Sequence, residues 1–286
     1  MKRPSWLVIP APNANDMDRI QELLDKGQLH SVCESAQCPN IGECFAKKTC
    51  TFMILGDICT RNCAFCAVTH GRPSCPDPNE PNMVGLTASQ LGLSYVVVTS
   101  VTRDDLPDGG ASQFAATIHA IKRENPNATV EVLIPDFGGK DAPLKQVISA
   151  APDVISHNLE TVPRLYSSVR PGAAYEQSLR LLKNVSLACP DQHIMSKSGL
   201  MLGLGETREE VVEVMKDLLQ AGCRILTLGQ YLRPSQQHHP VIEYVHPDTF
   251  DQLADIGNEL GFKQVIAGPL VRSSYHAAES FTAMTM

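Results

Sequence analysis

The sequence has a low aromatic content, no excess of positive charge and no long apolar segment. Aromatic residues make up 5% of the 286 residues, so we expect a mostly aliphatic core. The formal net charge is −7, which argues against binding to nucleic acid or to an anionic membrane. No apolar run approaches the length of a membrane span, and the patch Trp6–Ile9 is too short for a signal peptide. These absences predict a globular protein of the cytoplasm.

Cysteine, by contrast, is abundant. There are ten cysteines, most of them between positions 33 and 75. An even number would allow a disulfide scaffold, but a long aliphatic chain without a signal peptide has little need of disulfides. Clustered cysteines therefore favour metal ligation. Cys189 and Cys223 lie in or beside helix and strand patterns, where we expect them to be small buried hydrophobic residues.

Cys59, Cys63 and Cys66 form a C-x3-C-x2-C motif in one short segment. Three thiolates can ligate three irons of a cubane iron–sulfur cluster, which leaves one iron without a local protein ligand. An iron with an open position can bind a small molecule and become a catalytic centre. The spacing, with the aromatic Phe65 before the last cysteine, resembles that of the radical S-adenosylmethionine (SAM) enzymes.

Cys33, Cys38 and Cys44 form a second triad, C-x4-C-x5-C, which also lacks a fourth local cysteine ligand. Zinc motifs usually pair cysteines two to four residues apart, and neither triad offers two such pairs. Disulfide redox chemistry is a weaker alternative because no thioredoxin-like pattern surrounds a C-x-x-C pair. A zinc-stabilised binding protein and a two-cluster electron carrier remain as alternatives from other classes.

The rest of the chain alternates between strand and helix patterns. Strands are predicted at 51–55, 95–99, 130–134, 154–156, 199–204, 225–228 and 265–267, and helices at 16–26, 87–93, 111–123, 142–150, 175–187, 206–221 and 247–260. Apolar strands without polar alternation indicate a parallel sheet that is buried on both faces. We predict an α/β fold, a partial (β/α)6 TIM-type barrel, over residues 51–262. A cysteine-rich extension (1–50) would precede it, and a C-terminal segment (263–286) would close over the barrel mouth.

Polar residues occur at the ends of the predicted strands, as at Cys59, Asp136 and Glu206. In a parallel barrel the C-terminal strand ends share one face, and the active site lies there. By this argument we expect contacts with SAM or substrate from Thr99, Ser100, Asn158, Glu160, Lys197 and Gln230, with a structural polar role as the alternative for each. Phe65 of the cysteine motif is a further candidate.

The two triads in this order, with Leu29–Glu34 and Thr51–Gly56, resemble the lipoyl synthase family. The resemblance covers nearly the whole chain and extends to Arg103–Leu106, Asn158–Glu160, Lys197–Met201, Gly203–Thr207 and Arg272–His276. Related sulfur-inserting enzymes such as biotin synthase share only the Cys59–Cys66 triad. Another radical SAM sulfur insertion is the runner-up, and the R-S-S-Y segment Arg272–Tyr275 argues against it.

The resemblance implies a sulfurtransferase of lipoate biosynthesis with SAM and two 4Fe-4S clusters. Cys59, Cys63 and Cys66 would ligate the catalytic cluster, whose open iron binds SAM and yields a 5′-deoxyadenosyl radical. That radical would remove hydrogen from C6 and C8 of a protein-bound octanoyl-lysine. An auxiliary cluster would supply the sulfur, held by Cys33, Cys38, Cys44 and Ser274, with Ser273 as the alternative. A serine oxygen is a poor ligand for iron–sulfur chemistry, which suits a cluster that must come apart.

The resemblance also implies protein partners. These are octanoylated lipoyl-carrier domains, such as 2-oxoacid dehydrogenase E2 subunits and the glycine cleavage H protein, and an electron donor such as ferredoxin or flavodoxin. Cations recur around the strand ends, and they suggest a local basic face for an acidic carrier domain: Arg61, Arg103, Arg170, Lys197 and Arg272.

Some positions have a structural interpretation. Cys50 stands where the family pattern usually has a small residue; we expect a buried thiol there, with a fourth cluster ligand as the alternative, and a structural role for Cys75. Gly203–Gly205 lacks the third glycine of a dinucleotide fingerprint, so we expect a turn beside SAM. His238 and His239 are adjacent on an extended segment and would point apart, which favours a surface loop over a metal site.

Overall fold

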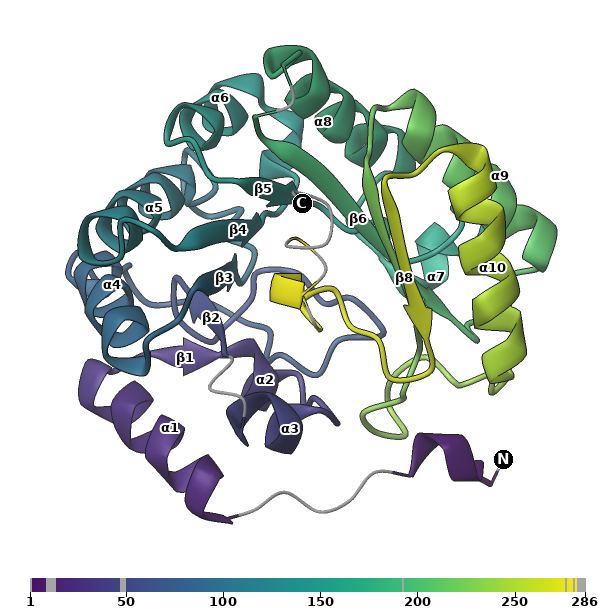
Figure 1. Ribbon diagram of the computed structural model, residues 1–286, viewed down its shortest axis with the longest axis horizontal. Helices are drawn as coiled ribbons and strands as arrows, with labels where there is room; N and C mark the ends of the chain where they lie inside the picture. The colour runs from purple at the N-terminus through teal and green to yellow at the C-terminus, as the bar shows by residue number, and fades with distance from the viewer. Residues whose placement is uncertain are drawn as a thin grey trace. The chain divides into compact units, whose positions relative to one another are not determined.

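The computed structural model describes residues 2–8, 14–46, 50–191, 193–275, 277–279 and 281 (Figure 1). Two compact units are present. The N-terminal unit comprises Pro10–Arg61 and Ala67–Ile155, and the C-terminal unit comprises Met1–Ile9, Asn62–Cys66 and Ser156–Met286. The cysteine loop therefore contributes Cys59 to the N-terminal unit, and Cys63 and Cys66 to the C-terminal unit.

In the N-terminal unit, strands β1 to β5 follow one another in chain order in the sheet. The strands are β1 (His30–Ser31), β2 (Thr51–Ile54), β3 (Tyr95–Ser100), β4 (Thr129–Leu133) and β5 (Val154–Ser156), whose last residue opens the C-terminal unit. The helices are α1 (Ala14–Gly27), α2 (Val32–Ser35), α3 (Ile41–Ala46), α4 (Glu80–Leu91), α5 (Ala111–Glu124) and α6 (Asp141–Ser149), with the 3-10 turn η2 (Phe137–Gly139). Strand β1 pairs with β2 antiparallel, whereas β2, β3 and β4 are parallel.

Helices α4, α5 and α6 cover one side of these strands (Figure 1). All four residues of β2 are buried, as the run of apolar residues predicts for a sheet covered on both faces. Helix α5 turns Phe114, Ile118 and Ile121 towards the core, the spacing of an amphipathic helix. Gly85 lets α4 approach α5 closely, because a Cβ there would lie 2.8 Å from the carbonyl oxygen of Ala120.

The C-terminal unit repeats the β/α pattern with strands β6 (Met195–Leu202), β7 (Ile225–Gln230) and β8 (Gln264–Gly268), all parallel and in chain order. Its helices are α7 (Tyr166–Val169), α8 (Tyr175–Ala188), α9 (Arg208–Gln220) and α10 (Pro247–Leu260), with the 3-10 turns η1 (Ser5–Leu7) and η3 (Pro163–Leu165). A capping box between Thr207 and Glu210 starts α9, and the left-handed Gly261 ends α10. The core is aliphatic with a few tyrosines and phenylalanines, as the composition predicts.

The alternating pattern predicted most elements, with bounds that differ by a few residues. The structure adds α2, α3 and the antiparallel β1 within the cysteine-rich region, where the sequence shows no periodicity. The helix predicted to start at position 87 begins at Glu80 instead. Within the described ranges no helix is long and apolar enough to cross a membrane. The domain boundaries at positions 50 and 262 stay predictions.

Candidate active site

The strand register brings several of the predicted polar residues to one edge of the N-terminal unit. Ile54, the last residue of β2, pairs with Ser100 on β3, and Thr99 pairs with Leu133 at the end of β4. The loops that carry Cys59 and Asp136 therefore leave the sheet at the same edge. This confirms, for the N-terminal unit, the expectation that polar residues gather at the C-terminal strand ends.

A buried polar turn directs the chain from β2 into the cysteine loop. Leu55 has a left-handed backbone (φ 70°). Its N–H donates to both carboxylate oxygens of Glu80 (3.0 and 2.9 Å), and its carbonyl accepts from Arg103 (3.2 Å). Arg103 is only 2% exposed and also donates to Asp105 and to the carbonyl of Ser74. Both polar groups of this turn are thus satisfied by charged side chains.

Cys59 lies in a backbone cradle that suits a thiolate ligand. Its own backbone pairs with the returning chain, through Cys59 N–H to the Thr69 carbonyl (2.8 Å) and Gly71 N–H to the Cys59 carbonyl (2.9 Å). Two backbone N–H groups, those of Arg61 and Thr102, donate to Cys59 Sγ at 3.4 and 3.3 Å. Hydrogen bonds to cysteine sulfur help set the potential of an iron–sulfur cluster. Cys59 therefore fits the ligand role that the motif implies.

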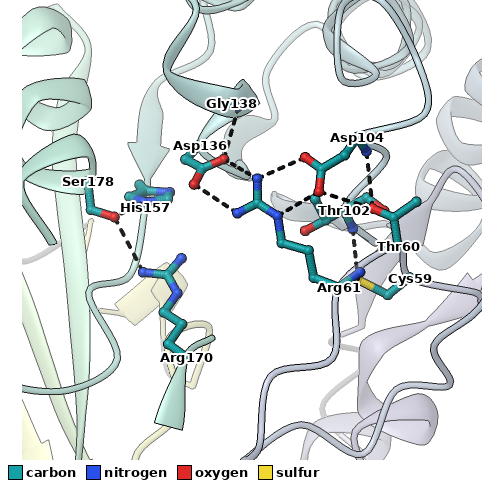
Figure 2. A network of polar contacts seen from close by, with 10 residues as sticks. All are labelled: Cys59, Thr60, Arg61, Thr102, Asp104, Asp136, Gly138, His157, Arg170 and Ser178. Atoms are coloured by element: carbon teal, nitrogen blue, oxygen red, sulfur yellow. Dashed lines mark hydrogen bonds and ion pairs between the residues drawn. The ribbon is translucent and has the colours of Figure 1, made fainter. Parts of the chain in front are cut away.

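The side chain of Arg61 lies between two carboxylates (Figure 2). It donates to Asp104 through Nε (2.7 Å) and Nη2 (2.8 Å), and to Asp136 through Nη1 (2.8 Å) and Nη2 (2.7 Å). Burial by itself lowers the pKa of Arg61, but the hydrogen bonds to Asp104 and Asp136 outweigh burial and raise it. The guanidinium is therefore permanently charged and occupied by its two partners.

Cys63 and Cys66 are held within the C-terminal unit by backbone contacts and two histidines. Ala64 N–H donates to the Val169 carbonyl (3.0 Å), and His239 N–H donates to the Ala64 carbonyl (2.8 Å). Nε2 of His238 lies 3.0 Å from the Cys66 carbonyl, an arrangement that requires the tautomer with hydrogen on Nε2. The sequence suggested only a surface loop at these histidines, whereas both are half-buried and support the cysteine loop. Phe65, between the cysteines, packs against the core of the unit.

The second triad occupies the two short helices of the cysteine-rich region. Cys33 is on α2, Cys44 is on α3, and Cys38 lies between them. All ten cysteines fall within the described ranges and are thiols, the soft donors that iron–sulfur clusters take. The three residues therefore fit a cluster by donor chemistry. Among the described residues no three His, Cys, Asp or Glu side chains are arranged as they would be around a metal ion.

Cys50 is buried, as expected, but it also contacts the second triad. A hydrogen bond joins its thiol to Cys33; this bond lowers the pKa of Cys33 and raises the pKa of Cys50 well above its ordinary value. Cys50 is therefore a hydrogen-bond partner of Cys33, one of the proposed ligands of the auxiliary cluster. The sequence pattern could not reveal this contact, because Cys33 and Cys50 are 17 residues apart in a region without periodicity. Cys75 is exposed.

A polar network surrounds Asn158 and Glu160 in the C-terminal unit. Asn158 Nδ2 donates to Glu160 (3.1 Å), and the Asn158 carbonyl accepts from Arg170 (2.8 Å). Ser178 contacts both Arg170 (3.4 Å) and Nε2 of His157 (2.9 Å), as Figure 2 shows. Burial raises the pKa of Glu160, although Arg170 and Asn158 oppose that shift.

Two of the predicted site residues carry a buried oxygen that has no partner among the described residues. Asn158 is 8% exposed, and its Oδ1 has no hydrogen-bond partner among the described residues; the same holds for Ser100 Oγ. Gly199 leaves room beside Asn158, since a Cβ there would lie 3.0 Å from Oδ1. Glu160 adopts a left-handed backbone (φ 68°), which costs energy for a residue with a side chain. Unsatisfied polar atoms and local strain are common at ligand sites.

The strand-end argument fails for Lys197. Lys197 pairs with Ile225 at the start of β7, whereas Leu202 pairs with Gln230 at its end. Five residues along a strand span about 16 Å, so Lys197 lies near the opposite end of the strand from Gln230. Lys197 is also buried. It does not join the other candidates at the C-terminal edge.

Gln230 is at the predicted edge, but its polar atoms are already used. Its Nε2 donates to the carbonyls of Leu202, Tyr231 and Glu243 (each 3.0 Å), and its Oε1 accepts from Val245 N–H (2.8 Å). An amide with these partners holds the chain after β7 against β6. These contacts give Gln230 a structural role, and its expected contact with SAM or substrate stays a prediction.

The expected basic face is wrong for two of its five cations. Arg103 and Lys197 are buried.

The predicted turn at Gly203–Gly205 is confirmed, with the Glu206 carboxylate accepting from Gly203 N–H (2.5 Å) and Leu204 N–H (2.9 Å).

The proposed serine ligand lies in a turn that follows β8. Tyr275 N–H donates to the Arg272 carbonyl (3.0 Å), which places Ser273 and Ser274 within the turn; both are half-buried. Val271, just before this turn, packs closely against Gly229 on β7, since a Cβ at position 229 would lie 2.1 Å from the Val271 carbonyl oxygen. The C-terminal segment is thus packed tightly on β7.

Comparison with known proteins agrees with this geometry. The model of the Radical SAM superfamily matches residues 53–218. Two solved structures share the fold: SuiB of Streptococcus suis bound to its precursor peptide (TM-score 0.55, 10% identity, 98% of this chain and 55% of that chain), and coproporphyrinogen III oxidase of Escherichia coli, a radical SAM enzyme (0.50, 13%, 72% and 51%). The chain spans about half the length of those two chains. The site and fold are thus those of a radical SAM enzyme, with an α/β partial TIM-type barrel.

Curated relatives narrow this class. Lipoyl synthase of Caldanaerobacter subterraneus subsp. tengcongensis is 57% identical over 97% of this chain and 96% of its own length. Lipoyl synthase of Nitrosomonas eutropha is 53% identical over 97% of this chain and 88% of its own length. The chain belongs to the lipoyl synthase family.

Proposed function

We propose that this chain inserts sulfur at C6 and C8 of a protein-bound octanoyl-lysine to give the lipoyl cofactor. The observation that carries the proposal is the identity of 57% to a lipoyl synthase over nearly the whole of both chains. The match covers 97% of this chain, which leaves too few unmatched residues for either cysteine triad or the R-S-S-Y serine to lie outside it. No other sulfur-inserting activity is favoured by a feature of the site.

The two triads divide the work. Cys59, Cys63 and Cys66 hold the 4Fe-4S cluster that binds SAM; Cys33, Cys38 and Cys44, with Ser274, hold the auxiliary 4Fe-4S cluster. When bound, these groups supply hydrogen abstraction from unactivated carbon and the sulfur atoms, chemistry that no side chain provides. The protein contributes positioning: backbone N–H groups orient Cys59, and His238 and His239 hold the segment of Cys63 and Cys66.

One unsatisfied oxygen in each unit supports the proposed contacts with SAM or substrate. Asn158 Oδ1 and Ser100 Oγ offer hydrogen-bonding capacity that the described protein atoms do not use. Thr99 Oγ1 donates to the Leu133 carbonyl (3.1 Å) and keeps its own lone pairs. Glu160, whose pKa is raised by burial, and Phe65 complete the proposed set. These side chains orient the bound molecules and exclude water.

The substrate reaches the site on a protein. The octanoylated carriers that we propose are lipoyl domains of 2-oxoacid dehydrogenase E2 subunits and the glycine cleavage H protein, and the proposed electron donor is a ferredoxin or flavodoxin. Ten thiols and two oxygen-sensitive clusters require a reducing compartment, which supports the cytoplasm.

An anaerobic reaction tests the proposal. The chain is reconstituted with iron and sulfide and then mixed with SAM, a reductant and an octanoyl-lysine peptide. We expect 5′-deoxyadenosine and a peptide that carries sulfur at C6 and C8, both detected by mass spectrometry. If neither product forms, the assignment is wrong; 5′-deoxyadenosine with sulfur at another carbon would indicate a different sulfur insertion.

A further inference from the structure

Arg61 connects three loops at the edge of the N-terminal unit. Its main chain lies two residues after Cys59, and its side chain reaches Asp104 in the loop after β3 and Asp136 in the loop after β4. The Asp136 side chain is fully buried and is fixed in turn by Gly138 N–H (3.0 Å). One guanidinium thus joins loops that are far apart in the sequence, through four hydrogen bonds of 2.7 to 2.8 Å.

Thr60 supports the same junction from the other side. Its N–H (3.0 Å) and its Oγ1 (2.9 Å) both donate to the Thr102 carbonyl, and Asp104 N–H donates to Thr60 Oγ1 (3.1 Å). These bonds set the separation between the cysteine loop and the loop after β3. The consequence is visible at Cys59, whose sulfur receives one N–H from each of the two loops (Figure 2).

We propose that Arg61 is a positioning residue that, by bridging Asp104 and Asp136, holds the Arg61 and Thr102 N–H groups on Cys59 Sγ and thereby raises the reduction potential of the cluster that Cys59 ligates. The inference rests on the proposed function, in which Cys59 is a cluster ligand. Reduction adds negative charge to the cluster and its sulfurs, so N–H donors stabilise the reduced state more than the oxidised state. The guanidinium charge acts in the same direction because it offsets the two carboxylates.

The alternative role for Arg61, a surface cation that docks an acidic carrier, fits the contacts less well. Its side chain is 13% exposed, and its donors are directed at Asp104 and Asp136. Together the three side chains carry a net charge of −1, which does not attract an acidic surface. The planar fork of arginine can bind two carboxylates at once, whereas lysine offers a single point charge.

The test compares Arg61→Gln and Arg61→Lys with the wild type and with Arg123→Gln. Arg123 is a matched control on α5, since it is also ion-paired but is 57% exposed and far along the chain from the cysteine loop. Each anaerobically reconstituted chain is analysed for iron and sulfide and titrated electrochemically. The signal followed is the electron paramagnetic resonance of the cluster that changes when SAM is added.

We expect full iron content in all four chains and a lower potential in both Arg61 variants. For Arg61→Gln the ratio of reduced to oxidised cluster at a fixed potential should fall about tenfold, a shift of about 59 mV for one electron. Arg61→Lys, which keeps the charge and is the safer variant for folding, should show a smaller fall, because it loses the bridge. Arg123→Gln should match the wild type.

The outcomes separate the inference from the proposed function. Cys59→Ala should abolish the SAM-dependent signal; if the signal persists, the ligand assignment is wrong and the inference fails with it. If Cys59→Ala abolishes the signal but the potential is unchanged in the iron-loaded Arg61 variants, the inference alone is overturned. A purely structural role would lower iron content or stability without moving the potential of the loaded cluster.

Discussion

Replacement of Arg103 by methionine should destabilise the fold strongly. The charged run Arg103–Asp105 would suggest a surface residue whose loss costs little. Methionine fills much of the same volume but removes four hydrogen bonds. The buried Leu55 carbonyl would lose its charged donor, which costs about 1–3 kcal/mol. The pair with Asp105, whose side chain is 40% exposed, adds about 1 kcal/mol after solvent screening. Ser74 is exposed, so water replaces the arginine there. The total is about 3 kcal/mol.

Thermal unfolding of the chain measures this loss. For a chain of this size about 3 kcal/mol corresponds to a fall in Tm of about 6–12 °C. Arg123→Met provides the control, because an exposed arginine should cost no more than about 0.5 kcal/mol. Arg103→Lys should fall between the two, since an ammonium can reach the Leu55 carbonyl but cannot fork onto Asp105. If Arg103→Met unfolds at the same temperature as Arg123→Met, the buried turn does not depend on the guanidinium and Arg103 does not stabilise the fold as we expect.

Three further predictions follow from local contacts. Cys50→Ala should leave iron content and sulfur transfer intact; loss of one cluster on iron analysis would make Cys50 a ligand. The pKa of Glu210 is lowered to about 2 by the Arg164 hydrogen bonds, so this pair stabilises the fold above the ordinary glutamate value of 4.5, and the stabilisation is lost as pH falls towards 2. Arg164→Gln should remove that pH dependence from urea unfolding, and the effect should be small because the pair is exposed; an unchanged acid limb contradicts this. Gly203→Ala should cost about 3 kcal/mol, since φ is 94° and a Cβ would lie 2.3 Å from the Glu243 carbonyl oxygen; a wild-type Tm contradicts this.

The repeating pattern predicted the β/α units and the edge on which polar residues collect. Those features follow from local periodicity and from the geometry of parallel strands, which the apolar runs before Cys59 and Asp136 already contain. The sequence also predicts the burial of Cys50, because this residue begins an apolar strand. The prediction was wrong at Lys197, which lies in the first half of β6 and pairs with the start of β7, at the opposite end from Gln230.

Contacts between segments that are distant in the sequence could not be predicted from the local sequence pattern. His238 and Cys66 are 172 residues apart, and nothing local marks the histidine as a support of the cysteine loop. Arg103 and Gln230 look like exposed polar residues, yet each satisfies backbone groups that a turn or strand end leaves without partners. Their burial depends on which carbonyl lies nearby, which only the folded chain determines.

The central claim is that the two triads hold clusters with separate duties. The measurement that tests it most directly is the yield of 5′-deoxyadenosine and of sulfur-bearing peptide from a reconstituted chain in which Cys33, Cys38 and Cys44 are all replaced by alanine. We expect this variant still to form 5′-deoxyadenosine from SAM but to transfer no sulfur to the octanoyl-lysine peptide. Sulfur transfer by the variant, or the loss of 5′-deoxyadenosine from a chain that retains about four irons, would contradict it.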